Sequence, residues 1–200
     1  MLAPEPFFEP RGTPFSEFHR IKALVELGYQ IDLVTYPLGQ DVDLPNLRIY
    51  RCPRPPFVTR VAIGPSFLKV LLDLLLAATA IRLARPGRYA AIHSHEEAGA
   101  LGVWLARRLG IPHLYDMHSS LPQQLANFSY SRSRLIRRFF ERSEQAMIDG
   151  SRVVITICQA LQDTVAATGA GERAILIENV MGGDVDSAAE PMPVRARWGI

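Results

Sequence analysis

Three histidines and an aspartate stand where two predicted strands end. His93 and His95 close one apolar run and, two residues apart, project to the same side of a strand. Asp116 and His118 close the next apolar run. Parallel α/β sheets hold ligands at the carboxyl ends of their strands, so these side chains indicate a site at one sheet edge. Imidazole and carboxylate groups can bind a divalent metal and activate water for hydrolysis.

Two other interpretations of these residues stay open. The spacing does not match a compact zinc motif, so a metal-dependent hydrolase built on His93, His95, Asp116 and His118 is only an alternative hypothesis. If these residues are purely structural, His93 packs into the sheet while His95 and His118 cap loops. Polar residues gathered at one edge favour a site.

A glycine loop precedes the first predicted helix. Thr13 suits an N-cap and Pro14 the first helical position, with Arg11 and Gly12 just before them. Backbone N–H groups at such a strand-to-helix turn bind phosphate well, and Arg11 adds charge. Neither dinucleotide nor P-loop glycine spacing is present, so a simple turn is the alternative. The helix buries one stripe: Phe15, Phe18, Ile21, Leu24 and Val25.

A basic amphipathic helix is predicted at residues 134–149. Arg134, Arg137, Arg138 and Arg142 occupy one arc of the helical wheel. The opposite arc is apolar: Leu135, Ile136, Phe139, Phe140, Ala146 and Met147. Such a helix can lie on an anionic membrane surface. We favour the alternative, in which the apolar arc covers the sheet and the arginines face water.

Short β-rich runs alternate with helical stretches along the whole chain. Strands are predicted at residues 31–36, 47–51, 90–94, 113–116, 153–157 and 175–177, after a stub at residues 1–3. Helices are predicted at residues 15–27, 66–84, 98–109, 134–149 and 159–168. This order predicts an α/β fold: a Rossmann-like, doubly wound parallel sheet with helices on both faces.

Composition narrows the class of protein. With 200 residues, 48% apolar and 21% charged, the chain is globular, and its net charge of +2 gives no argument for a nucleic-acid partner. The apolar segment at residues 67–83 carries three charges, so it is predicted as a heavily buried helix rather than a membrane span. Cys52 and Cys158 lie far apart without a signal peptide, which predicts free thiols and a cytoplasmic protein.

Four stretches in this order resemble the N-terminal domain of the family 4 glycosyltransferases, retaining enzymes of GT-B architecture. They are LAPEPFFEPRGTPFSEFHRIKALVELGYQIDLVTY, AAIHSHEEAGALGVWLARRLGIPHLYDMHSSLPQ, VVITICQALQD and AILIENVMGGDVD. The last stretch departs from the family's usual Pro-Asn-Gly-Val-Asp, and Cys158 replaces a common serine. The ordered series covers nearly the whole chain.

The resemblance implies two Rossmann-like domains facing a cleft, with the acceptor held by the first and a nucleotide-sugar by the second. Residues 1–186 would form the first domain, and residues 187–200 would begin the linker to an absent C-terminal domain. Arg11, Gly12 and Thr13 would approach the donor diphosphate. His118 would be catalytic, near the transferred sugar, and His95 with Glu96 would line the acceptor side. No cofactor and no obligatory metal are expected.

The sequence therefore predicts the N-terminal fragment of a retaining glycosyltransferase, acting on a glycan, lipid or small-molecule acceptor. Alone, this chain is expected to show no significant turnover. A peripheral contact with the inner membrane face would use Arg134, Arg137, Arg138 and Arg142. A sugar-nucleotide epimerase and a non-catalytic binding domain are the rival classes.

Overall fold

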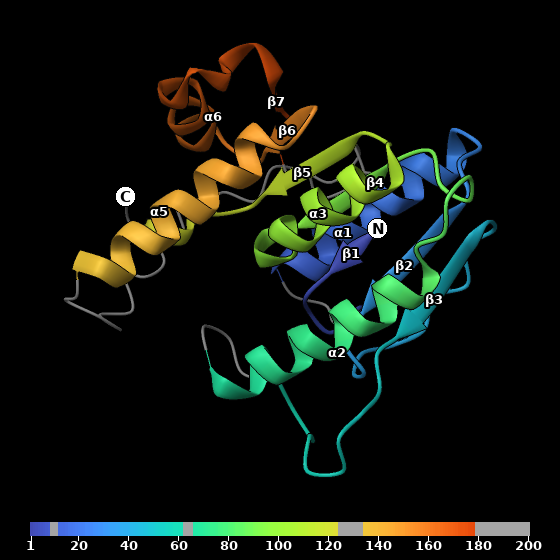
Figure 1. Cartoon of the computed structure of the whole chain (residues 1–200). Helices are drawn as coiled ribbons and strands as arrows, with labels where there is room; N and C mark the ends of the chain where they lie inside the picture. Colours follow the sequence, from blue (N-terminus) through green and yellow to red (C-terminus); the bar gives the residue numbers. More distant parts are fainter. Residues whose placement is uncertain (9–11, 62–65, 124–133, 179–200) are drawn as a thin grey trace, which may run out of the picture.

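A computed structural model describes residues 1–8, 12–61, 66–123 and 134–178, and it confirms the predicted α/β fold (Figure 1). Seven parallel strands form one sheet: β1 Leu2–Ala3, β2 Ile31–Thr35, β3 Leu47–Arg51, β4 Ile92–His95, β5 His113–Met117, β6 Val153–Thr156 and β7 Ala174–Leu176. The α-helices are α1 Gly12–Glu26, α2 Phe67–Leu83, α3 Gly99–Leu109, α5 Arg134–Asp149 and α6 Gln159–Val165. Short helical turns η1 Glu96–Ala98, η2 Ala166–Ala170 and η3 Gly171–Arg173 complete the described part.

The strand order is β3-β2-β1-β4-β5-β6-β7, so the sheet grows outward in both directions from β1. Leu2 pairs with Val34 on one side and with Ser94 of β4 on the other. The order in which strands are added reverses between β1 and β4, and ligands of open α/β sheets bind beside such a switch point. The carboxyl ends of β1, β4 and β5 are therefore the place to look for a site.

The helices divide between the two faces of the sheet. Ile21 and Val25 of α1 pack on Ala3, Ile31 and Leu33. The opposite face carries α2 and α3, whose Leu72, Leu76 and Leu105 share a core with Leu2, Val34 and Ile92. Met147 of α5 and Leu161 of α6 continue this face over β5 and β6. Because β4 alternates, Ile92 and Ser94 face α3 while His93 and His95 face α1.

Helix α3 lies unusually close to the sheet because of two glycines. A Cβ on Gly102 would stand 2.3 Å from His113 Nε2 and 2.6 Å from Ser94 Oγ, and one on Gly99 would meet Met147 Sδ at 2.6 Å. Beneath α3, the side chains of the neighbouring strands form a buried series of hydrogen bonds. Ser151 Oγ donates to the Met147 carbonyl, so it accepts from His113 Nδ1, and His113 Nε2 accepts from Ser94 Oγ. Burial lowers the pKa of His113 to about 4, which keeps this ring neutral.

Three expectations about helices need correction. α1 begins at Gly12, so Thr13 lies inside the first turn rather than at the N-cap. Phe15 and Phe18 are only half-buried. α2 buries one face through Leu72, Leu76 and Ala80 instead of being buried all round, and its outer side leaves Phe67 98% exposed and Leu74 64% exposed.

Within the described residues, no helix is long and apolar enough to cross a bilayer. Cys52 is buried and Cys158 is exposed, and both are free thiols as predicted. The predicted domain end at residue 186 lies outside the described residues, as does Arg11.

Candidate functional site

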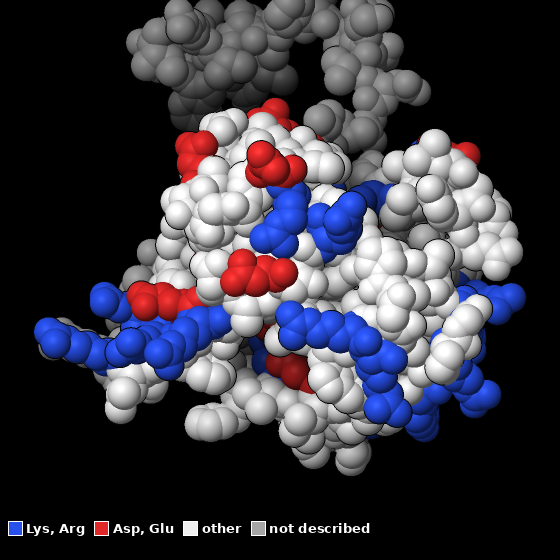
Figure 2. All heavy atoms as spheres, turned by 45° about the horizontal axis from the view of Figure 1, so that its top comes forward, with Lys and Arg blue, Asp and Glu red and all other residues white. Residues whose placement is uncertain are grey.

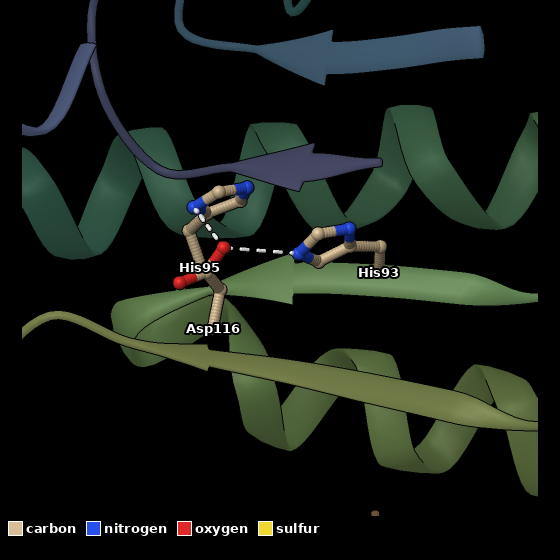
Figure 3. A group of neighbouring side chains, drawn as sticks. All are labelled: His93, His95 and Asp116. Atoms are coloured by element: carbon tan, nitrogen blue, oxygen red, sulfur yellow. Dashed lines mark hydrogen bonds and ion pairs between the residues drawn. The ribbon is translucent and has the colours of Figure 1, made fainter. Parts of the chain in front are cut away.

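The polar side chains predicted from the sequence meet at the carboxyl edge of the sheet, on the α1 side of β4 and β5. Figure 3 shows His93 and His95 projecting from β4 toward Asp116 of the neighbouring strand. His95 and Asp116 are register partners, so the two strand ends place them side by side. His118 follows β5 directly. All four residues named by the sequence are thus brought together.

Asp116 is the centre of this cluster. Its Oδ2 atom lies 2.8 Å from Nε of Arg20 and 3.1 Å from Nε2 of His93, while Oδ1 lies 3.1 Å from Nε2 of His118. His95 Nδ1 is 3.7 Å from Oδ2. Burial acts to raise the pKa of Asp116, but the surrounding imidazoles outweigh it and hold that pKa well below its usual range. Asp116 is therefore an ionised, fully buried anchor for its neighbours.

The two histidines of β4 stack. The ring centroids of His93 and His95 are 5.0 Å apart with an interplanar angle of 11°. Burial lowers the pKa of both rings, so both are neutral at physiological pH. Among the described residues, neither nitrogen of His95 has a hydrogen-bond partner, although Glu17 Oε1 lies 3.7 Å from its Nε2. His95 is completely buried and cannot itself reach a ligand at the surface.

Two buried glutamates complete the cluster, and sequence reasoning missed both. Burial raises the pKa of Glu17 to about 8 and, together with the nearby Glu17, raises that of Glu5 well above its ordinary value. Each of these carboxyl groups shifts the pKa of the other, and neither oxygen of Glu17 has a hydrogen-bond partner among the described residues. One signal was available: Glu17 precedes the buried Ile21 and Val25 by one and two turns, which puts it on the inward ridge of α1.

Glu96 occupies the rim of the site in a strained conformation. Its φ of +46° lies in the left-handed region, which costs a non-glycine residue about 1–2 kcal/mol. Ser119 Oγ donates a hydrogen bond of 2.7 Å to its carboxylate. Burial raises the pKa of Glu96 to about 7, so this carboxyl group can accept or release a proton near neutrality. Strain held beside a sheet switch point is typical of functional positions.

The predicted phosphate loop stands at the start of α1. Gly12 is exposed, with a φ of +30°, and a Cβ built there would meet nothing within 4 Å. Thr13 is half-buried, and the first turn of α1 carries no acidic residue. A side chain at Gly12 would therefore meet none of the described residues, and the positive dipole end of α1 favours an anion beside it.

The cluster suits a cation poorly. Ligand atoms of His93, His95 and Asp116 lie within 4.8 Å of one another, which is the arrangement that a metal hypothesis needs. However, the guanidinium of Arg20 already sits on Asp116 Oδ2, and its positive charge would repel a metal ion at that oxygen. The stacked rings also stand parallel instead of converging on one point. The geometry favours a network of ion pairs and imidazole contacts around Asp116 over a bound metal.

The four arginines named for a membrane face stand elsewhere. Arg134, Arg137 and Arg138 lie on the first half of α5 and Arg142 is the first residue of its second half; all four are exposed. They take no part in the cluster around Asp116.

Comparison with known proteins identifies a family and structures of the same fold. Residues 19–179 match the family model described as a glycosyl transferase 4-like domain. A UDP-glucosyltransferase from Polygonum tinctorium that glucosylates indoxyl superposes with a TM-score of 0.56 at 12% identity, over 98% of this chain and 56% of that one. HepE of Anabaena, solved with UDP, has a TM-score of 0.54 at 16% identity, over 99% and 49%.

A third structure, LpCGTa in complex with UDP, has a TM-score of 0.54 at 14% identity, over 92% of this chain and 55% of that one. At such identities these structures speak for the fold alone. The chain spans about half the length of each of them. Among curated proteins, none matches the sequence.

Proposed function

We propose, for a chain that belongs to the glycosyl transferase 4-like domain family, that it forms the acceptor-side half of a glycosyltransferase using a UDP-activated sugar. The family match over residues 19–179 carries this proposal. It is supported by the solved structures of the same fold, two of which hold UDP. Transfer with retention of the anomeric configuration is part of the proposal.

The cluster around Asp116 would orient His118 toward the transferred sugar. With its Nε2 turned to Asp116 Oδ1 at 3.1 Å, the ring of His118 is fixed in direction. A proton held on that nitrogen leaves Nδ1 free to accept a hydrogen bond from a sugar hydroxyl. Arg20 and His93 hold Asp116 in turn, so the position of His118 depends on a packed, buried support.

Glu96 is the better candidate for direct contact with the acceptor. Its carboxyl group is only partly buried and stands at the rim, whereas His95 is completely buried behind it. We assign His95 a positioning role. A carboxyl group with a pKa of about 7 can take part in hydrogen bonding to an acceptor hydroxyl in either protonation state.

The leaving diphosphate would be stabilised without a metal. Negative charge grows on the diphosphate as the glycosidic bond breaks, and the amino end of α1 with Gly12 and Thr13 offers N–H groups and a positive dipole end there. Arg11, which lies outside the described residues, is proposed to add a full positive charge. No obligatory metal is proposed at the histidine cluster, because the guanidinium of Arg20 already lies against Asp116 Oδ2, the oxygen that a metal would need.

The test uses the protein encoded by the complete reading frame that contains residues 1–200. It is incubated with UDP-sugars and candidate acceptors, UDP release is measured, and the anomeric configuration of the product is read from its NMR coupling constant. We expect UDP release that needs His118, with the configuration of the donor kept. Failure to consume any nucleotide-sugar would overturn the proposal, and an inverted product would overturn retention.

Residues 1–200 by themselves are proposed to lack significant turnover, since they span about half the length of the structures they resemble. The same assay decides this point. UDP release by the 200-residue chain at an ordinary enzymatic rate would refute it.

A further inference from the structure

The first half of helix α5 is largely exposed, and only Phe140 in it is half-buried. Every residue from Arg134 to Phe139 is exposed, and the residues that anchor the helix to the sheet, Glu144, Met147 and Ile148, all lie in its second half. Leu135 is 81% exposed and Phe139 is 65% exposed. Apolar side chains of this size on a polar, arginine-rich helix need a partner.

This exposure corrects the sequence-based interpretation of the helix. The apolar arc was expected to cover the sheet, but of its residues only Met147 is buried, and the packed side is shifted so that Leu135, Ile136, Phe139 and Ala146 are exposed. At 100° per residue, Glu144, Met147 and Ile148 point into the protein, and Leu135 and Phe139 point away from them. The apolar ridge formed by Leu135 and Phe139 therefore faces outward.

A row of arginines runs directly beside that ridge. Arg134, Arg138 and Arg142 are spaced four residues apart, so they form the neighbouring ridge of the same helix. Arg137 lies on another side, where its Nε is 3.3 Å from Glu141. Figure 2 shows Lys and Arg side chains gathered on the left of the molecule, where Figure 1 places the start of α5.

We propose that the exposed half of α5 docks on the surface of a membrane that contains anionic lipids. Leu135 and Phe139 enter the boundary between headgroups and acyl chains, and the arginine stems reach back so that their guanidinium groups bind lipid phosphates. The helix lies in the plane of the interface and does not cross it. An anionic membrane offers acyl chains to the apolar ridge and lipid phosphates to the row of arginines.

The charges favour a lipid surface over a second copy of the chain. Two copies meeting through this ridge would bring their arginine rows together with only Glu141 to offset them. Helix α2 offers a useful contrast: its outward stripe of Phe67, Val70 and Leu74 is also exposed but has no arginine row beside it. The proposed surface is therefore restricted to α5.

Docking would also orient the candidate site. In a parallel α/β sheet the helices run opposite to the strands, so α5 starts at the carboxyl edge, the same edge that holds His118 and Glu96. A protein resting on the start of α5 holds this edge near the membrane. The docking itself uses none of the residues of the candidate site, so it stands or fails separately from the proposed function.

Vesicle sedimentation with the 200-residue chain tests the proposal. Vesicles of phosphatidylcholine alone are compared with vesicles that contain phosphatidylglycerol, at low and high salt. We expect binding to the anionic vesicles only, weakened by salt. The variant Arg134→Gln/Arg138→Gln/Arg142→Gln is expected to lower the partition coefficient about 100-fold. Leu135→Gln/Phe139→Gln is expected to abolish stable binding.

The control removes the same charge elsewhere. Arg82→Gln/Arg85→Gln/Arg107→Gln changes three exposed arginines at the opposite edge and is expected to bind like the wild type. Equal binding of the wild type and the α5 arginine variant would overturn the proposal, as would no binding of the wild type to anionic vesicles. A wild-type dimer in light scattering that Leu135→Gln/Phe139→Gln converts to monomer would instead identify a second copy as the occupant.

Discussion

Replacing Glu17 by glutamine should stabilise the protein, and more so at higher pH. Glu17 is completely buried, and its pKa of about 8 stands above the ordinary value of 4.5. The folded protein therefore keeps a proton that the unfolded chain has released. The stability associated with this proton is fully present below about pH 4.5 and is lost as the pH rises to about 8.

The size of the effect follows from the same two values. Each pH unit above 4.5 costs the wild type about 1.4 kcal/mol while Glu17 remains protonated, which amounts to about 3 kcal/mol at pH 7. Glutamine has the same shape and carries no such cost. Its amide also keeps one donor and one acceptor in the place of the protonated carboxyl group. The variant should exceed the wild type by less than about 1 kcal/mol at pH 5 and by about 3 kcal/mol at pH 7.

Urea unfolding of both proteins at pH 5, 7 and 8.5 measures this difference. Glu26→Gln is the matched control, because Glu26 lies on the same helix with its side chain 65% exposed. Its effect should be small and independent of pH. A difference between Glu17→Gln and the wild type that stays constant across this range would mean that Glu17 is ionised in the folded protein and that its pKa is not raised.

Three further substitutions test the site and the fold. Gly12→Val should reduce transfer by the complete enzyme about 100-fold with a stability loss of only about 1–2 kcal/mol. Gly28→Val, which introduces similar backbone strain at the other end of α1, should leave transfer unchanged. Equal kinetics for the two variants would mean that Gly12 is not part of the site. His118→Ala should lower kcat/KM about 100-fold with little change in Tm, and a matching loss of stability and activity would return it to a structural role. Gly102→Ala should cost about 2–4 kcal/mol in thermal unfolding because its Cβ would collide with His113, and an unchanged Tm would contradict the close packing of α3.

Most of the fold could be predicted from patterns along the amino-acid sequence. Buried parallel strands are short apolar runs, and their order with the helices leaves few topologies. The helix predicted at residues 134–149 has the bounds found for α5, and the strand at residues 47–51 those of β3. His93, His95, Asp116 and His118 could be found because they follow strands, and strand ends share an edge.

What could not be predicted depends on rotation about a helix axis. The sequence shows that α1 and α5 each have an apolar side, but the packed side is set by the sheet beneath. In α1 the inward ridge includes Glu17, a residue type that is almost never buried without a partner. In α5 the packed side contains Glu144, which accepts hydrogen bonds from the Leu121 amide and Ser120 Oγ, and most of the apolar arc is left outside. In both helices, contacts with the rest of the fold determine which side packs inward.

The position of Asp116 has a consequence for how the protein acquires its site. His118 is two residues away, but the partners of Asp116 on α1 and β4 lie far along the chain and meet it only when the sheet is assembled. A partly folded chain with only local structure would lack the contacts of Asp116 with Arg20 and His93. Below the ordinary pKa of 3.8 an unfolded chain protonates Asp116 while the folded protein keeps it ionised, so a nuclear magnetic resonance probe on this carboxyl group at acid pH would report that the sheet is assembled.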